Sequence, residues 1–219
     1  MKLVLPLLVI GFLLSSATLP AQTDIAIGEW KSYLPYVNGN WVTQSDSKVY
    51  FATEWSLAVL DKTDLSFQRI SKVEGLSQVG ISLVQFNRFS NTLMIVYTNS
   101  VIDLVKPEGI FSLFDIANSQ SITGDKEVYH VLMEDENTAY ISANYGLSQL
   151  DLRENKFPFT TFTGMPVEAS AVFQGYLYMA TEEGIFRILQ GSSFPEDFSK
   201  WEKLDEEEGF PSAYASTAM

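Results

Sequence analysis

Residues that could perform catalysis are few in this chain of 219 residues. It contains one histidine, His130, and no cysteine. A catalytic thiol, a zinc–thiolate centre, an iron–sulfur cluster and a disulfide framework are therefore excluded. His130 lies in the largely apolar run 128–132, and no serine shows the elbow motif of a hydrolase that would use it as a base. We interpret His130 as a polar position in a strand and expect neither a catalytic residue nor a cofactor.

Acidic side chains cluster at 134–137 and at 205–208. Clustered carboxylates suit a hard cation such as Ca²⁺, but both clusters lack the alternating ligands and central glycine of a calcium-binding loop. The first separates two strand-like runs, and the second precedes the turn-forming residues Gly209, Phe210 and Pro211. We predict solvated loops at both places and no metal site. A pair of carboxylates at glycosidase spacing stays open, because separation in space defines that mechanism and no pair stands out in the sequence.

The charge balance restricts the partners. The chain has 14 Lys and Arg against 27 Asp and Glu, which gives a net charge of −13. Such a chain repels phosphate backbones and anionic lipid surfaces, so nucleic-acid binding is not expected. With 46% hydrophobic and 13% aromatic residues, the sequence can still bury a core.

The N-terminus has the three regions of a secretory signal peptide. Lys2 precedes an apolar run at 3–14, and small and polar residues follow it. The run is shorter than the roughly 20 residues of a membrane helix, so we expect export without a transmembrane segment. We place the signal peptide at 1–21, with cleavage after Ala21 and Ala17 as the alternative; a retained hydrophobic helix is the other interpretation.

An internal repeat organises the rest of the chain. Four twelve-residue segments align without a gap, and each is typical of a β-hairpin with a small residue at its turn. Their spacing is that of the roughly 40–45-residue blade of a β-propeller. The hairpins lie at about 49–61, 93–105, 139–151 and 177–189, and their small seventh residues are Ser56, Ser100, Gly146 and Gly184.

Further short strands flank these hairpins, which predicts blades of four antiparallel strands and a nearly all-β protein. We expect upstream strands at 81–86, 128–133 and 170–173, and downstream strands at 67–70, 110–114, 159–162 and 201–204. Residues 22–219 then form a partial N-terminal β-propeller, with about four to five blades out of seven. The segment 30–33 would be a displaced strand that closes the ring in the whole protein, and two sheet faces would be exposed in this fragment. A single β-sandwich is the alternative fold.

The tryptophans suggest where partners could bind. The recurrence of Trp30, Trp41, Trp55 and Trp201 at equivalent places in the blades favours packing in the core or between blades over stacking on sugars. Trp55 and Tyr145 occupy the same slot at the hairpin turn. If they are exposed on one rim, we expect them to be partner contacts.

Five linked motifs are more specific than the blade pattern alone. They are GEWKSYLPY (28–36), WVTQS (41–45), YFATEWSL (50–57), SKVEGLS (71–77) and NSVIDL (99–104). Together these motifs resemble the PorZ family of the type IX secretion system of Bacteroidetes. The resemblance covers essentially the whole mature chain and implies a longer protein, with two successive seven-bladed propellers and a C-terminal domain like a β-sandwich. It also implies a place at the outer membrane beside a sortase resembling PorU and partners resembling PorV and PorQ, which attach cargo to anionic lipopolysaccharide.

These observations lead us to expect a non-enzymatic scaffold of that secretion machinery, located at the cell surface. One alternative is the periplasmic ligand-sensing propeller of a hybrid two-component regulator, and another is a polysaccharide lyase or glycosidase. Because the chain is acidic, we expect weak or no binding of anionic lipopolysaccharide by this region itself.

Overall fold

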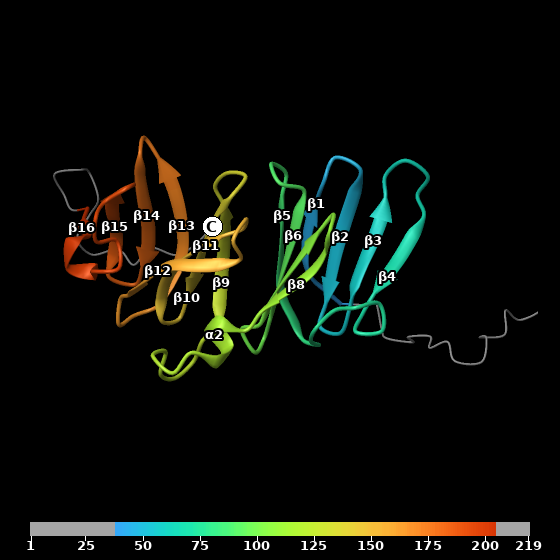
Figure 1. Ribbon diagram of the computed structural model, residues 1–219, viewed down its shortest axis with the longest axis horizontal. Helices are drawn as coiled ribbons and strands as arrows, with labels where there is room; N and C mark the ends of the chain where they lie inside the picture. The colour runs from blue at the N-terminus through green and yellow to red at the C-terminus, as the bar shows by residue number, and fades with distance from the viewer. Residues whose placement is uncertain (1–37, 205–219) are drawn as a thin grey trace, which may run out of the picture. The chain divides into compact units, whose positions relative to one another are not determined.

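The computed structural model describes residues 38–204, which form four antiparallel sheets of four strands (Figure 1). In every sheet the strands are neighbours in chain order, as in a propeller blade. The all-β prediction is confirmed. The predicted signal peptide, the segment 30–33 and the acidic cluster 205–208 lie outside the described residues. The first sheet contains β1 (Gly39–Gln44), β2 (Lys48–Thr53), β3 (Leu57–Asp61) and β4 (Phe67–Ile70).

The other three sheets repeat this plan. The second contains β5 (Ile81–Asn87), β6 (Thr92–Tyr97), β7 (Ile102–Lys106) and β8 (Gly109–Leu113). The third contains β9 (Val128–Met133), β10 (Thr138–Ala143), β11 (Gly146–Asp151) and β12 (Lys156–Phe162). The fourth contains β13 (Val167–Phe173), β14 (Tyr176–Thr181), β15 (Gly184–Leu189) and β16 (Glu202–Lys203). The short helices α2 (Asp115–Asn118) and η1 (Phe198–Lys200) lie in connections. Within residues 38–204, no helix has the length and apolar character needed to cross a membrane.

The pairing of the first and second strands is irregular in all four sheets. The register shifts between Gly39 and Trp41, between Ile81 and Leu83 and between Val167 and Ala169, and a similar shift occurs where β9 pairs with β10. A β-bulge of this kind increases the local twist of a strand. The repeat is therefore present in backbone irregularities as well as in the residue pattern.

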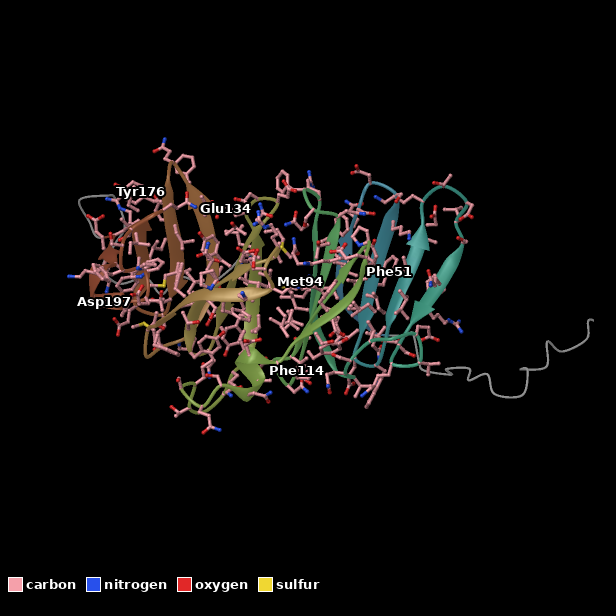
Figure 2. All side chains as sticks on the ribbon, viewed as in Figure 1. Phe51, Met94, Phe114, Glu134, Tyr176 and Asp197 are labelled. Atoms are coloured by element: carbon pink, nitrogen blue, oxygen red, sulfur yellow. The ribbon has the colours of Figure 1, made fainter. Side chains whose placement is uncertain are left out.

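Apolar side chains are buried between consecutive sheets. One cluster joins the first and second sheets, a second joins the second and third, and a third joins the third and fourth. Strand β6 is buried along its whole length, because Leu93, Ile95 and Tyr97 belong to one cluster while Met94 and Val96 belong to the next. Met94 is labelled in Figure 2. A strand covered on both faces cannot show the alternation of a half-exposed strand.

Hydrogen bonds also link neighbouring sheets. The Phe86 amide donates to Thr43 Oγ1 at 3.2 Å, and Asn87 Nδ2 donates to the Asp135 carbonyl at 2.7 Å. Ser142 Oγ and Ser170 Oγ are 3.1 Å apart, between the third and fourth sheets. Each sheet thus depends on its neighbours for both apolar burial and polar pairing.

The expectation that the tryptophans pack in the core or between blades is only partly correct. Trp201 is buried in the cluster between the third and fourth sheets. Trp41 is 38% exposed and Trp55 is 43% exposed, so neither is a core residue. Trp55 lies at a hairpin tip, between the end of β2 at Thr53 and the start of β3 at Leu57.

Candidate interaction surface

Trp55 is presented by a tightly closed turn between β2 and β3. The Thr53 amide donates to the Ser56 carbonyl at 2.9 Å, Thr53 Oγ1 donates to the same carbonyl at 3.0 Å, and the Ser56 amide donates back to Thr53 Oγ1 at 3.2 Å. Thr53 and Ser56 are buried. The two residues between them, Glu54 and Trp55, are consequently fixed at the tip with their side chains in solvent.

The loop that leads from the first sheet to the second is attached to this turn. The amides of Gly80 and Ile81 both donate to the Glu54 carbonyl, at 2.9 and 3.1 Å. Val79, which precedes Gly80, is 47% exposed. The next hairpin is tied to the same loop, because Asn99 Nδ2 donates to Gln78 Oε1 at 3.3 Å. We call the surface formed by Glu54, Trp55, Gln78, Val79 and Asn99 the Trp55 rim.

A buried carboxylate anchors the loop beneath the Trp55 rim. Asp103 on β7 is fully buried and accepts three hydrogen bonds. Its donors are the Ser77 amide at 2.8 Å, the Tyr97 hydroxyl at 2.6 Å and Ser112 Oγ at 2.7 Å. Burial, and then the hydrogen bond to Asp103 and its charge, raise the pKa of Tyr97, which stays a neutral donor. Because Ser77 is next to Gln78, the Asp103 network fixes the position of the rim.

Tyr145, the other sequence-predicted contact, is not on the surface. It is only 8% exposed and belongs to the cluster between the second and third sheets. Its hydroxyl lies 3.1 Å from Ser148 Oγ, and its ring packs at a tilt against Phe162. Burial raises the pKa of Tyr145 to about 12. Trp55 is therefore exposed, as a predicted partner contact must be. Tyr145 is buried, and its ring packs against Phe162 of its own sheet.

His130 lies on β9, at the contact between the third and fourth sheets. Its Nδ1 accepts a hydrogen bond from the Ser170 amide at 3.4 Å, and its pair across the ladder is Ser142. Burial lowers the pKa of His130. The interpretation of His130 as a polar strand position agrees with this contact, which uses the neutral imidazole as an acceptor.

The contact of His130 predicts a pH-dependent stability. Since its folded pKa lies below the unfolded value of about 6.5, the stabilisation is complete above that pH and is lost as the pH falls through the folded pKa. We expect wild-type protein to lose more unfolding free energy between about pH 7 and pH 5 than His130→Asn, which keeps an acceptor that does not titrate. Urea unfolding at the two pH values measures this difference. Equal losses in the two proteins would contradict the role of His130.

The acidic cluster at 134–137 forms the turn between β9 and β10. Asp135 Oδ1 accepts from the amides of Asn137 and Thr138, both at 2.8 Å, and Glu134 accepts from Nε2 of Gln190, which follows β15. These carboxylates therefore bind protein donors. Among residues 38–204, no group of three or more His, Cys, Asp or Glu side chains is arranged to hold a metal ion.

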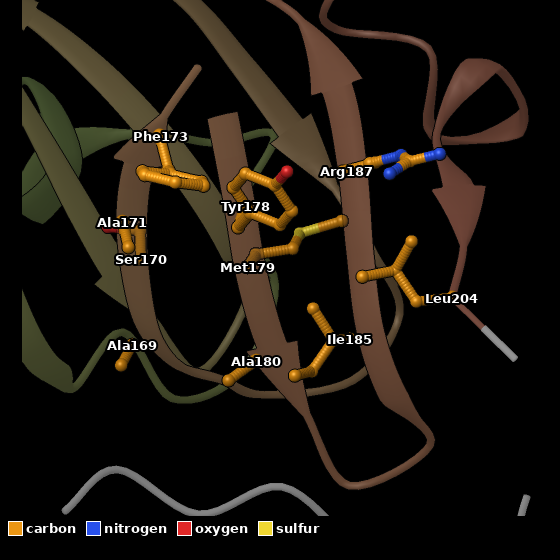
Figure 3. Close-up of a pocket in the computed structure, with 10 residues that line it drawn as sticks. All are labelled: Ala169, Ser170, Ala171, Phe173, Tyr178, Met179, Ala180, Ile185, Arg187 and Leu204. Carbon is orange, nitrogen blue, oxygen red and sulfur yellow. The ribbon is translucent and has the colours of Figure 1, made fainter. Parts of the chain in front are cut away.

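The outer faces of the first and fourth sheets are apolar and exposed. On the first, Val42, Phe51 and Phe67 are 58, 36 and 51% exposed; Phe51 is labelled in Figure 2. On the fourth sheet, ten residues line an open pocket with a volume of about 640 Å³, among them Phe173, Tyr178, Ile185 and Leu204 (Figure 3). Apolar faces of this kind mark sites where further protein packs.

Known proteins share this arrangement of four-stranded sheets. A family model described as "TSS9, PorZ, N-terminal beta-propeller domain" matches residues 49–202. The solved structure of PorZ, described as an essential bacterial surface component of the type IX secretion system of Porphyromonas gingivalis, superposes with a TM-score of 0.71 at 22% identity. The alignment covers 76% of this chain and 22% of that one.

A second solved structure has a similar fold. It is the extracellular domain of the putative hybrid two-component system BT4673 from B. thetaiotaomicron, with a TM-score of 0.60 and 12% identity. That alignment covers 80% of this chain and 23% of BT4673. No curated protein sequence matches the chain. The chain thus spans less than a quarter of the length of either structure.

Proposed function

Because the chain belongs to the family of PorZ N-terminal β-propeller domains of the type IX secretion system, we propose that it is an exported, non-enzymatic docking module of that machinery. The family match over residues 49–202 is the observation that carries this proposal. The solved PorZ structure, which is described as a bacterial surface component, supports a location at the cell surface.

The proposed partners are the proteins of the attachment complex, namely a sortase resembling PorU and partners resembling PorV and PorQ. The Trp55 rim is the proposed contact, because it combines an exposed indole and an exposed Val79 with a backbone held by hydrogen bonds. A rigid aromatic anchor loses little conformational entropy on binding. We assign the binding of anionic lipopolysaccharide to other parts of the full-length protein, because the net charge of −13 opposes its binding to this chain.

A single substitution tests the rim. Trp55→Ala in the full-length protein is expected to weaken binding to the purified sortase complex about 10- to 100-fold, as is typical of an aromatic hot spot. The backbone bonds of the Thr53–Ser56 turn do not involve the indole, so the fold is kept. Surface plasmon resonance with the immobilised complex gives the two affinities.

Phe89→Ala is the matched control. Phe89 is 62% exposed and lies in the turn between β5 and β6, at the other end of β5 from the Trp55 rim. We expect Phe89→Ala to bind the sortase complex with the same affinity as wild type. If Trp55→Ala binds the sortase complex as tightly as this control, the Trp55 rim is not the partner contact.

The likeness to BT4673 favours one second candidate, a ligand-sensing propeller of a two-component regulator. The two functions differ in what the gene encodes beyond residue 219. A second propeller in the same reading frame supports the secretion role. A membrane helix followed by a kinase domain supports the sensor.

A further inference from the structure

A pocket with a volume of about 330 Å³ lies between the first and second sheets. The buried side chains of Leu57 and Val59 line it from the first sheet, and that of Leu93 lines it from the second. Gln68 and Asn91, which are exposed, line it where it meets solvent. Small-molecule sites have volumes of about 300–1,000 Å³, so the pocket is large enough for a small ligand. None of the residues of the Trp55 rim lines this pocket.

The first sheet has glutamine at a position where the second and third sheets have phenylalanine. Three equivalent cross-strand rows face the next sheet, and each begins at the first residue of a repeat. The rows are Tyr50–Val59–Gln68, Met94–Leu104–Phe111 and Tyr140–Gln149–Phe159. Phe159 packs against the cluster between the third and fourth sheets, and Lys106 Nζ lies 5.1 Å from the centre of the Phe111 ring. A phenyl ring occupies this place in the other two contacts between sheets, and the smaller Gln68 leaves part of it open.

A lysine on the same face of the first sheet also departs from the repeat. Lys48 lines the pocket and lies two residues before Tyr50 on β2. Residues two apart on a strand share a face, so the Lys48 side chain lies on the face toward the second sheet. The equivalent residues of the next two repeats are Thr92 and Thr138. The contact between the first and second sheets therefore has a cation that the other two contacts lack at this position.

The charge of Lys48 is not paired with a carboxylate. Asp61, which is opposite Lys48 on β3, accepts from the Thr63 amide at 2.8 Å. Lys48 Nζ makes no hydrogen bond or ion pair with any of residues 38–204. Since β2 and β4 run in the same direction, Glu74, which follows β4, lines the pocket at the end away from Lys48. Glu74 Oε2 accepts from the Ser71 amide at 2.7 Å. The pocket thus has a cationic end, an aliphatic middle and an acidic end.

We propose that this pocket binds a medium-chain aliphatic carboxylate, with the carboxylate at Lys48 and the alkyl chain over the buried aliphatic side chains. Tyr50 and Phe86, the two aromatic residues of the lining, stack on each other with ring centroids 5.7 Å apart. The lining therefore suits an alkyl chain better than an aromatic ring. The far end of the ligand is uncharged, because Glu74 repels a second carboxylate there. The net charge of −13 opposes polyanions, whereas this ligand has one charge, which Lys48 neutralises.

NMR of the chain with labelled isoleucine methyl groups and octanoate as the probe tests the site directly. At millimolar octanoate we expect the δ1 methyl resonances of Ile70 and Ile110, which line the pocket, to shift. Those of Ile102 and Ile141, which are buried between the second and third sheets, should not move. Absence of any shift would overturn the proposal. A shift of Ile185, on the open face of the fourth sheet, in place of Ile70 and Ile110 would also overturn it.

Gln68→Phe introduces the side chain of the other two sheets and should close the pocket. We expect this variant to bind octanoate at least about 10-fold more weakly than wild type in the same titration. Its stability in urea should equal or exceed that of wild type, because the ring buries apolar surface. Gln120→Phe is the matched control, since it adds the same ring at an exposed position after α2. The control should bind octanoate as wild type does. Equal affinity of all three proteins would place the site elsewhere and overturn the proposal.

Lys48→Thr, which introduces the residue of the next two repeats, tests the charge. We expect octanoate to bind about 10-fold more weakly or less tightly still, because a charge-assisted hydrogen bond is lost. The affinity for octan-1-ol, which has the same chain without the charge, should not change. Equal losses for octanoate and octan-1-ol would contradict a carboxylate at Lys48. The proposal does not depend on the secretion role, so the two can fail separately.

Discussion

Replacement of Asp103 by alanine is expected to lower the free energy of unfolding by about 4 kcal/mol. The substitution leaves three donors without an acceptor, namely the Ser77 amide, the Tyr97 hydroxyl and Ser112 Oγ. Each buried polar group that loses its partner costs about 1–3 kcal/mol. Asp103 and Tyr97 are both fully buried, so water cannot easily replace the lost acceptor.

Urea unfolding measures this loss, with Asp46→Ala as the control. Asp46 is exposed on the first sheet's β1–β2 turn, and its substitution should change stability by no more than about 0.5 kcal/mol. A loss below about 1 kcal/mol for Asp103→Ala would show that the network contributes little. The network also anchors the loop under the Trp55 rim, so the variant should bind the sortase complex more weakly even under conditions where it is folded.

Gly146→Ala is expected to be similarly severe, with a loss of about 3 kcal/mol or more. Gly146 has a φ of +137°, and a Cβ atom there would lie 2.0 Å from the Thr161 carbonyl oxygen. That oxygen belongs to the backbone of β12 in the same sheet, so the clash can be relieved only by separating β11 from β12. Strained conformations of this region cost about 1–3 kcal/mol before any clash is counted.

Gly175→Ala is the matched control for Gly146. Gly175 also has a positive φ, of +78°, but a Cβ atom there meets nothing within 4 Å. Its substitution should cost only about 1–2 kcal/mol, the usual penalty of the left-handed region. Urea midpoints of the two variants give the comparison. Equal stability of the two would mean that strand β12 moves away from Gly146 at no cost.

The hairpins were predictable because their signal is local. Each combines an apolar first strand with a small residue at the turn, and Ser100, Gly146 and Gly184 do adopt positive φ. Strand β1 was missing from the prediction. Its residues Gly39, Asn40 and Trp41 do not alternate between apolar and polar side chains as a half-buried strand would, and most of this strand is exposed in the structure.

The candidate surface was less predictable because burial depends on neighbouring sheets. Trp55 and Tyr145 have the same place in the repeat, yet one is in solvent and the other packs against Phe162. The role of Asp103 had a signal in the sequence, a single carboxylate inside the apolar run 101–105. Its three donors come from a loop and two other strands, and their meeting is a property of the fold.

We propose that this chain acts by being bound through the Trp55 rim. The most direct measurement is the amount of sortase that co-purifies with the tagged full-length protein from outer membranes. We predict that wild type and Phe89→Asp recover equal amounts, and that Trp55→Asp combined with Val79→Asp recovers little. Equal recovery with all three proteins, or no recovery of secretion-system proteins with any of them, would contradict the account.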